Sequence, residues 1–434
     1  MPKNLKHNDL FYRKPPPTYQ SGRSKQYHPR PKRREQVSIF RVGLVLVVLV
    51  AAIVVVYNFQ KPKTAPETEG DMAVSQVQTP APEGEETGSE MVSEPAMDME
   101  SRITAGGGAA SEIAETADSD EDSLTPAKER DISEAEFSLF NTMMIVDGVG
   151  YRYYDFVESG AIAFVDMLED AQERLGDQVN FYSMVVPDAA DVMLPQDFLR
   201  QVDTSDQQKA LDYLTGSIQS VVPKMHPIDP YDILKANCDK DLYFKTDANW
   251  TALGAYYGYR AFAKEAGLTA LPLTDFTEST VEGFCGELYP KSNYNELLNY
   301  TEPVTVYTPP GEIFVSYFEY GEKMETALIG NADNYGTEEK YSVFLTGNYA
   351  YMEIENRGIT DGSALVLVKD SLGNPMVPFL TQHYQYIYVV DYRHWSENMS
   401  TLMSHVSSDN VLLVCRMTAA TESYEVSLLE EVFS

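Results

Sequence analysis

The feature that most constrains this 434-residue chain is an unbroken apolar run from Val42 to Tyr57, which contains no ionised side chain. With its apolar flanks at 39–59 the run reaches about 21 residues, enough to cross a hydrocarbon core of about 30 Å as a helix. We therefore expect a transmembrane helix over 37–59, with Arg41 reaching back to the membrane interface. A cleaved signal peptide is the competing interpretation, but the basic region before the run is long and no small-x-small cleavage site follows it.

The segment before this run, residues 1–36, is strongly basic. It carries ten Lys and Arg residues against Asp9 and Glu35, and its prolines, three of them consecutive at 15–17, prevent a regular helix. We expect a disordered tail. The positive-inside rule places this tail in the cytoplasm and everything after the membrane helix outside the cell. The sequence thus predicts a single-pass protein of the cell membrane.

Residues 60–130 form a second zone of unusual composition. They hold 17 acidic and five basic residues, repeated Pro, Gly, Ser and Thr, and almost no aromatic residues. Such a segment cannot bury enough apolar surface to offset its conformational entropy. We expect a disordered acidic linker that holds a folded extracellular domain, residues 131–434, away from the membrane.

The charge and the cysteines of the chain exclude several classes of function. The net charge is −33, and residues 131–434 contribute 17 basic and 47 acidic side chains. Phosphate contacts need a basic surface, so we expect no nucleic-acid partner. Three cysteines cannot form a disulfide scaffold, although Cys238 and Cys285 could form one extracellular disulfide and Cys415 ends an apolar strand. We expect no metal and no cofactor, because the sequence shows no ligand cluster, phosphate loop or dinucleotide fingerprint.

The folded domain alternates strand-like and helical patterns. Continuous apolar runs are typical of strands buried on both faces, and they occur at 181–186, 364–369, 386–390 and 411–415. Helical patterns occur at 159–175, 206–222, 251–266 and 375–383. This alternation predicts an α/β sandwich around a mainly parallel sheet. In such sheets the residues just past the strand ends line the site, and Asp188, Ser371 and Asp391 occupy that position.

One of these strand ends has the sequence KDSLGN at 369–374. A serine between a buried strand and a helix can be exposed for nucleophilic attack. The backbone N–H group of Leu372, at a positive helix end, could then hold an oxyanion. A serine or aspartate at this place is equally a common helix cap. The fragment alone leaves both interpretations open.

A second motif spans residues 243–257, YFKTDANWTALGAYY. This stretch resembles the DHHW family of Gram-positive surface proteins, which is similar to the alginate O-acetyltransferase group of SGNH-hydrolase-like proteins and has the signature T-D-x-H-W before a helix. The resemblance covers most of the chain beyond about residue 131 and continues through VVPD at 185–188, FCGELYPKS at 284–292, FLTGNYAYMEI at 344–354 and LVKDSLGNPMVPFLTQHYQYIYVVDYRHW at 367–395. It implies a three-layer α/β/α sandwich.

The resemblance also implies roles for individual residues. Ser371 matches the family's nucleophile, and Asp247 matches the carboxylate that orients the base. Asn249 stands where the family has the catalytic histidine. A serine hydroxyl needs a neighbouring general base, and a carboxamide has no usable basicity. The alternative interpretation of Asn249 is a helix cap ahead of Thr251.

Further candidates surround this trio. His394 could replace the missing base, and Arg393 resembles a family arginine that binds a polar group of the substrate. Gly347 and Asn348 resemble elements of an SGNH oxyanion hole, although a turn between strands needs the same residues. Trp250 belongs to a group of aromatic residues near the motifs, which could stack on sugar rings at a rim or pack in the core.

Two functions follow as hypotheses. The first is a catalytically degenerate relative of polysaccharide O-acetyltransferases that binds cell-envelope polysaccharide, because Asn249 replaces the expected histidine. The alternative is an active serine-dependent O-acetyltransferase or acetylesterase, which would take an acyl donor and a cell-wall or exported glycan as partners. A membrane-tethered structural component fits the tail and linker as well. The sequence leaves the oligomeric state open.

Overall fold

The structure is a computed structural model that describes residues 127–140, 142–288, 300–319 and 322–434. The predicted cytoplasmic tail, the predicted transmembrane helix 37–59 and nearly all of the predicted linker lie outside these ranges. No helix in the described ranges is both long enough and apolar enough to cross a membrane.

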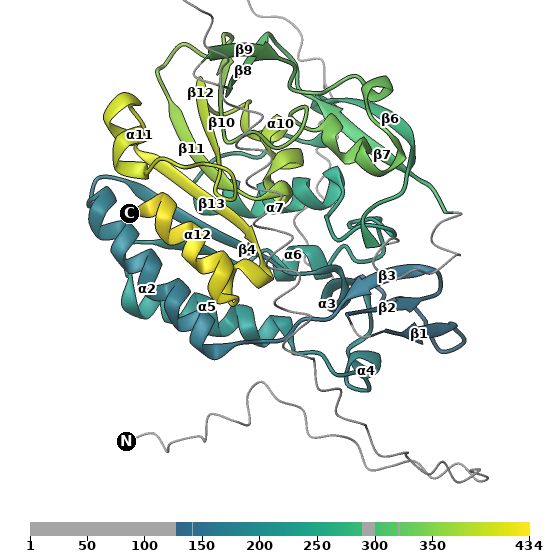
Figure 1. The fold of residues 1–434 in the computed structure, drawn as a ribbon. Helices are drawn as coiled ribbons and strands as arrows, with labels where there is room; N and C mark the ends of the chain where they lie inside the picture. The colour runs from purple at the N-terminus through teal and green to yellow at the C-terminus, as the bar shows by residue number, and fades with distance from the viewer. Residues whose placement is uncertain (1–126, 141, 289–299, 320–321) are drawn as a thin grey trace, which may run out of the picture. The chain divides into compact units, whose positions relative to one another are not determined.

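An eight-stranded sheet forms the centre of the described domain, in the order β5-β4-β13-β11-β12-β10-β8-β9 (Figure 1). Its strands are β4 (Asn180–Val186), β5 (His226–Ile228), β8 (Ile313–Glu319), β9 (Glu322–Thr326), β10 (Tyr351–Asn356), β11 (Ala364–Lys369), β12 (Tyr386–Asp391) and β13 (Asn410–Arg416). Each of the four predicted strands is present, and β11 has the predicted bounds.

The sheet is mixed: its larger part is parallel, as predicted, and the rest of it is antiparallel. Strands β5, β4, β13, β11 and β12 pair in parallel, whereas β12-β10, β10-β8 and β8-β9 pair antiparallel. The two halves differ in burial. Every residue of β11 is buried, whereas buried and half-buried residues alternate along β10. Antiparallel strands with one partly solvated face show this alternation, so only the continuous runs of the parallel half are conspicuous in the sequence.

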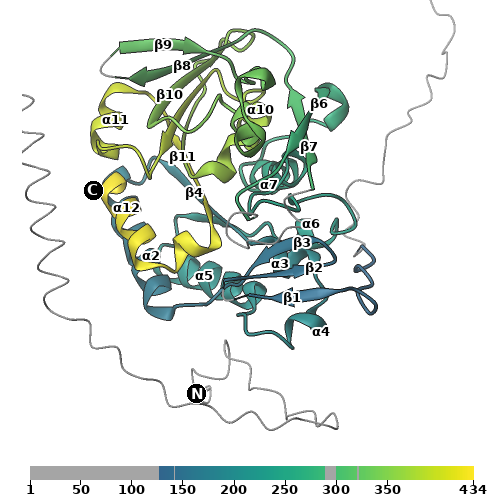
Figure 2. The same cartoon turned by 45° about the vertical axis from the view of Figure 1, so that its right-hand side comes forward.

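Helices cover both faces of the parallel half. Phe181 and Tyr182 are neighbours on β4, so their side chains point to opposite faces of the sheet. Phe181 contacts Phe433 of α12, and Tyr182 contacts Phe262 of α7, with ring centroids 5.2 and 5.3 Å apart. Figure 1 shows α2, α5 and α12 grouped on the first side, and Figure 2 shows α7 and α10 on the other. The parallel half therefore has the expected three layers.

The described helices fall into two kinds. The α-helices are α2 (Glu158–Leu175), α3 (Ala189–Met193), α4 (Gln196–Leu199), α5 (Gln207–Val221), α6 (Tyr231–Lys235), α7 (Ala252–Glu265), α10 (Val377–Leu380), α11 (Met399–His405) and α12 (Ser423–Phe433). The 3₁₀ helices are η2 (Leu273–Asp275), η3 (Ala332–Asn334), η4 (Thr337–Val343), η5 (Ser371–Met376) and η6 (Met417–Ala420). Three predicted helices match α2, α5 and α7 to within one residue at each end.

The predicted helix 375–383 is shorter than expected. The chain forms the 3₁₀ helix η5 first, and only Val377–Leu380 is α-helical. Pro375 lies inside η5, and Pro378 lies in the first turn of α10. Proline has no N–H group and clashes with the preceding turn, so it is tolerated only near the beginning of a helix. The two prolines therefore divide the segment.

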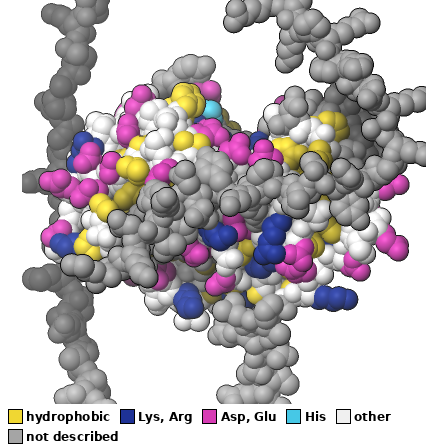
Figure 3. All heavy atoms as spheres, turned by 90° about the horizontal axis from the view of Figure 1, so that it is seen from below, with side chains coloured by type: hydrophobic (Ala, Val, Ile, Leu, Met, Phe, Trp, Pro, Cys, Tyr) yellow, Lys and Arg dark blue, Asp and Glu magenta, His cyan; other side chains and the backbone are white. Residues whose placement is uncertain are grey.

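Two small antiparallel sheets lie beside the main one. They consist of β1 (Phe137–Leu139), β2 (Met143–Val146) and β3 (Val149–Arg152), and of β6 (Thr277–Phe284) and β7 (Glu302–Thr308). The Gly150 N–H group on β3 donates to the Lys245 carbonyl, which ties the first small sheet to the T-D-A-N-W motif. The face seen in Figure 3 carries acidic and basic side chains side by side rather than one continuous basic patch.

None of the three cysteines forms a disulfide. Cys238 and Cys285 are both buried thiols, so the disulfide between them that the sequence leaves open is absent. Cys415 is fully buried on β13, as its apolar strand predicts.

Candidate active site

Ser371 lies immediately after β11, at the edge of the sheet where the parallel strands end. Asp370 caps the following 3₁₀ helix: its Oδ1 atom accepts a hydrogen bond of 2.7 Å from the Leu372 N–H group. The buried strand and this tight turn fix the backbone on both sides of the serine. Ser371 is itself buried, with 8% of the residue exposed, so the turn holds its hydroxyl among the polar groups packed around it.

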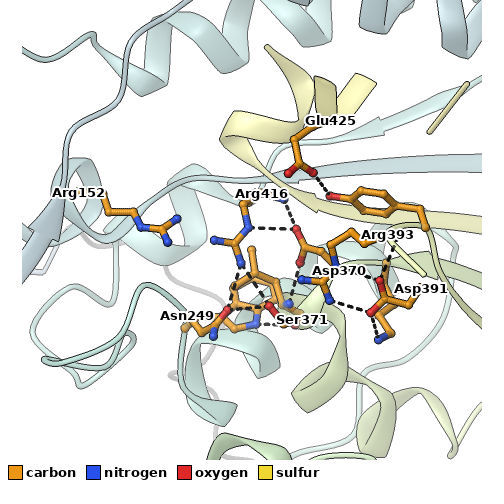
Figure 4. Close-up of polar contacts among 12 residues, drawn as sticks. Arg152, Asn249, Asp370, Ser371, Asp391, Arg393, Arg416 and Glu425 are labelled. Carbon is orange, nitrogen blue, oxygen red and sulfur yellow. Dashed lines mark hydrogen bonds and ion pairs between the residues drawn. The ribbon is translucent and has the colours of Figure 1, made fainter. Parts of the chain in front are cut away.

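Asn249 links Ser371 to Asp247. The Ser371 Oγ atom donates to Asn249 Oδ1 at 3.2 Å (Figure 4). Asn249 Nδ2 donates to Asp247 Oδ1 at 2.7 Å. A carboxylate only accepts hydrogen bonds, so the amide nitrogen must face Asp247 and the amide oxygen must face the serine. The amide thus makes both hydrogen bonds that a neutral histidine would make in a triad. The structure thus brings together Ser371, Asn249 and Asp247, which the family resemblance assigns to one site.

Asn249 does not cap the helix that follows it. The cap of α7 is Thr251, whose Oγ1 atom accepts a 3.2 Å hydrogen bond from the Gly254 N–H group. The helix-cap interpretation of Asn249 is therefore wrong, because Thr251, two residues later, caps the helix. This leaves the Asn249 side chain to bridge Ser371 and Asp247.

The Asp247 carboxylate is buried and well supplied with donors. Besides the Asn249 side chain, the backbone N–H groups of Asn249 and Glu287 donate to it at 2.9 and 3.0 Å. Burial raises the pKa of Asp247 above its ordinary value, and these backbone hydrogen bonds act in the opposite direction. Gly286 packs against this side chain so closely that an added Cβ would lie 2.3 Å from the Asp247 Cβ atom.

Glu302 on β7 anchors the loop that carries Asp247, and sequence reasoning missed it. Its buried carboxylate accepts hydrogen bonds from the backbone N–H groups of Lys245 and Thr246 and from Thr246 Oγ1, at 2.7 to 3.0 Å. Thr246 Oγ1 in turn accepts from the Gly286 N–H group at 2.8 Å. One acidic side chain thus fixes two segments that are far apart in the sequence. An isolated glutamate in a polar stretch carries no pattern that signals this role.

Arg416 is the second residue that sequence reasoning missed. Its Nη2 atom donates to Ser371 Oγ at 3.2 Å and to Asn249 Oδ1 at 3.3 Å (Figure 4). Its Nε atom and its backbone N–H group both donate to Asp370 Oδ2. Burial opposes the charge of Arg416, but the carboxylates of Asp370 and Asp188 hold its pKa above the ordinary value. Arg416 is the last residue of β13, so the rule that singled out Ser371 at a strand end could have found it.

The structure corrects the expected roles of Leu372 and Trp250. The Leu372 N–H group already donates to Asp370 Oδ1, so it is not available to hold an oxyanion. The Trp250 ring is fully buried, and its Nε1 atom donates to the Leu372 carbonyl at 2.7 Å. Trp250 therefore packs in the core and supports the serine turn from inside, where it cannot stack on a substrate.

Arg393 and His394 also do not take the roles that the sequence predicts. Arg393 donates to both carboxylate oxygens of Asp391, and the second of these also accepts from the fully buried Lys369. The Arg393 guanidinium is thus held by the strand end of β12. The His394 side chain is exposed, and within the described ranges the Ser371 hydroxyl contacts Asn249 and Arg416 instead. The structure does not bring His394 to Ser371 as a base.

Asn348 approaches the serine turn from another loop. Its Oδ1 atom accepts a 2.9 Å hydrogen bond from Asn374 Nδ2, and Asn374 is a buried residue of η5. The preceding Leu345 and Thr346 have positive φ angles of 58° and 59°, and Gly347 follows at 123°. Non-glycine residues rarely adopt such φ values. The loop is therefore a strained turn held against η5.

Asp188 follows β4 at the same edge of the sheet. Its carboxylate is buried, and its Oδ2 atom has no hydrogen-bond partner in the described part of the chain. Burial raises the pKa of Asp188, and the nearby Arg416 and Arg152 partly oppose this. In the described ranges no three His, Cys, Asp or Glu side chains are grouped so that they could hold a metal ion.

This geometry can now be compared with known proteins. The family model described as "DHHW protein" matches residues 114–390, well over half of the sequence. This chain belongs to the DHHW family. A comparison with curated proteins finds no match.

Three solved structures are similar to this DHHW protein, and the first two share its fold. A DHHW family protein from Eubacterium siraeum has 24% identity and a TM-score of 0.62, covering 69% of this chain and 98% of its own. Bacillus cereus PatB1 with a sulfonyl adduct has 18% identity and a TM-score of 0.52, covering 70% and 100%. The O-acetyltransferase domain of Pseudomonas putida AlgJ covers 68% and 99%, with 11% identity and a TM-score of 0.38.

Proposed function

We propose that this DHHW protein is a catalytically degenerate relative of polysaccharide O-acetyltransferases, which binds cell-envelope polysaccharide at the Ser371 site without turnover. The observation that carries the proposal is the position of Asn249. Its amide takes both hydrogen bonds of a triad histidine, to Ser371 Oγ at 3.2 Å and to Asp247 at 2.7 Å. A carboxamide cannot accept the serine proton near neutral pH. Losing the base of a triad typically lowers kcat by about 10⁴-fold or more.

The substrate class rests on family membership. The DHHW family resembles the alginate O-acetyltransferase group, and this chain shares its fold with PatB1 over 70% of its length. The aromatic-rich domain with an acidic surface suits a neutral glycan better than an anionic polymer. We extend the proposal to location. The basic tail, the apolar run at 37–59 and the acidic linker support a single-pass membrane protein whose folded domain lies outside the cell.

An activated acetyl ester, 4-nitrophenyl acetate, tests the proposal. We expect the full-length chain to cleave this ester no faster than its Ser371→Ala variant, because no base activates the serine. The Asn249→His variant should gain cleavage that disappears when Ser371→Ala is added. Ester cleavage by the natural chain that is lost on Ser371→Ala would overturn the proposal and establish the enzyme.

A sulfonyl fluoride gives an independent readout. PatB1 has been solved with a sulfonyl adduct, so reagents of this class are suitable probes for the shared fold. We expect no sulfonylation of Ser371 in the natural chain, measured by mass spectrometry of the digested protein, and sulfonylation of Ser371 in Asn249→His. Rapid labelling of the natural chain at Ser371 would contradict the proposal.

The alternative function, a serine-dependent O-acetyltransferase or acetylesterase, is favoured by Arg416. A guanidinium donating to Ser371 Oγ at 3.2 Å stabilises the alkoxide form of the serine. Such an enzyme would pass the serine proton to a group other than Asn249. The ester and sulfonyl experiments separate the two functions, because only an active enzyme would show ester cleavage and sulfonylation that depend on Ser371 in the natural chain.

A further inference from the structure

A groove lies on the antiparallel half of the sheet, apart from the Ser371 site. Its volume is about 880 Å³, and its floor consists of one face of β8, β10 and β12. The loop that begins at Trp395, together with residues of α11, lines one side. Neither Ser371, Asn249 nor Arg416 lines it. Figure 1 shows these strands and α11 at the opposite end of the domain from β1, β2 and β3.

The sequence of β10 explains why this face is open. Tyr351, Glu353 and Glu355 are half-buried and line the groove, whereas the intervening Met352 and Ile354 are buried. Side chains alternate between the two faces of a strand, so the opposite face packs in the core. The groove face therefore combines aromatic rings and carboxylates.

The side chains on the floor are arranged in rows. Glu353 pairs across the strands with Tyr388, and Glu355 pairs with Tyr386. The rings of Tyr386 and Tyr388 lie 6.4 Å apart between centroids with an angle of 15° between their planes. Two nearly parallel rings therefore run along β12, and a row of hydrogen-bond acceptors runs beside them along β10.

The charge of the groove restricts what can bind. Four carboxylates line it, against two permanent cations, Lys323 and Arg357. Both cations are already paired within the groove, Lys323 with Glu353 and Arg357 with Glu355. The remaining acidic side chains are Glu325 and Glu397. A polyanion entering this groove would meet excess like charge.

We propose that this groove is a second binding site, which takes an uncharged pyranose oligosaccharide. The apolar C–H faces of pyranose rings fit against the rings of Tyr386 and Tyr388, and sugar hydroxyls can donate to the carboxylates of Glu353 and Glu355. The floor is not continuously apolar, so it does not suit an amphipathic helix. The proposal does not depend on the Ser371 site.

Calorimetric titration of the full-length chain in detergent tests the proposal. The probes are three neutral hexasaccharides, of β-1,4-linked N-acetylglucosamine, glucose and mannose, and a polyuronate hexasaccharide as the anionic counterpart. We expect at least one neutral hexasaccharide to bind. Tyr386→Ala and Tyr388→Ala should each weaken its binding about tenfold, the usual effect of truncating an aromatic anchor. Tyr388→Phe keeps the ring and should bind within about twofold of the natural chain.

Two controls separate this groove from other surfaces. Tyr424 on α12 is 71% exposed and does not line the groove, so Tyr424→Ala should leave binding unchanged. Far-ultraviolet circular dichroism verifies that each variant is folded. The proposal is overturned if no neutral hexasaccharide binds or if the polyuronate binds more tightly. It is also overturned if Tyr386→Ala and Tyr388→Ala leave binding unchanged, or if Tyr424→Ala weakens it as much as Tyr388→Ala.

Discussion

The Asn249→His variant provides the sharpest test of how the site works. In this variant the imidazole Nε2 atom, one ring position further from the backbone than Asn249 Oδ1, would face the Ser371 Oγ atom, which lies 3.2 Å from that oxygen. Its Nδ1–H group would take the place of Nδ2, which lies 2.7 Å from Asp247. The Ser371 hydroxyl and the Asp247 carboxylate are therefore already on the two sides of the side chain at position 249. Restoring a positioned general base typically accelerates the reaction about 10²- to 10⁴-fold.

Arg416 limits the gain. Its Nη2 atom lies 3.3 Å from Asn249 Oδ1, so it would stand beside the imidazolium that forms when histidine takes the serine proton. Two like charges at this separation repel by about 1 to 5 kcal/mol, depending on the effective dielectric constant. The Asp247 carboxylate attracts the imidazolium from the other side. We therefore expect a gain near the lower limit, about 100-fold over the Ser371→Ala background.

The assay is the rate of 4-nitrophenyl acetate cleavage by the full-length chain between pH 5 and 9. The rate of Asn249→His should rise with pH and then level off, because only the neutral imidazole can accept a proton. Asn249→Gln serves as the matched control, since it keeps an amide and should gain nothing. The reasoning is refuted if folded Asn249→His is as inert as Asn249→Gln, or if its new activity persists after Ser371→Ala.

Three further predictions concern stability. Asp391→Asn should lower the free energy of unfolding by about 3–5 kcal/mol in urea titrations, because it leaves Lys369 buried without a counter-charge. In the natural chain burial opposes ionisation of Asp391, but its cationic partners keep its folded pKa below the ordinary value. The stability that the ionised Asp391 contributes is therefore present above about pH 4 and is lost as the pH falls further. If Asp391→Asn were as sensitive to acid as the natural chain, this reasoning would be contradicted. Glu302→Ala leaves the Thr246 donors unpaired and should lower the free energy of unfolding by about 2–5 kcal/mol. A decrease of less than about 1 kcal/mol would contradict this. Thr251→Ala removes a helix cap and should lower the free energy of unfolding by about 1 kcal/mol, measured by thermal unfolding. An unchanged stability would argue against Thr251 as the cap of α7.

Local sequence patterns predicted much of the parallel half of the domain. The run at 364–369 is apolar enough to be buried on both faces, and β11 has these bounds. The helical periodicity at 251–266 corresponds to α7. These elements could be predicted because the burial of a strand and the periodicity of a helix depend on side chains that are close together in the sequence. The antiparallel strands are less visible because half of their residues remain partly exposed, as on β10.

The groups around Ser371 could be predicted only in part. Family motifs gave Ser371, Asp247 and Asn249, and the structure brings these three side chains together. Arg416 and Glu302 have no motif, because their roles come from contacts with segments far away in the sequence. The Leu372 N–H group was wrongly expected to be available, since the geometry of the Asp370 cap decides which donors remain.

The sequence by itself determined that position 249 lacks a basic side chain, because basicity is a property of the residue type. It also determined where the composition changes, from a basic segment through an apolar run to an acidic segment, because composition depends on residue types alone. Only the tertiary structure decided that Asn249 takes the hydrogen bonds of a histidine and that Arg416 donates to the same serine. The order of the parallel strands, β4-β13-β11, brings Asp188, Arg416 and Ser371 to one edge, and neighbours in that order are far apart in the chain.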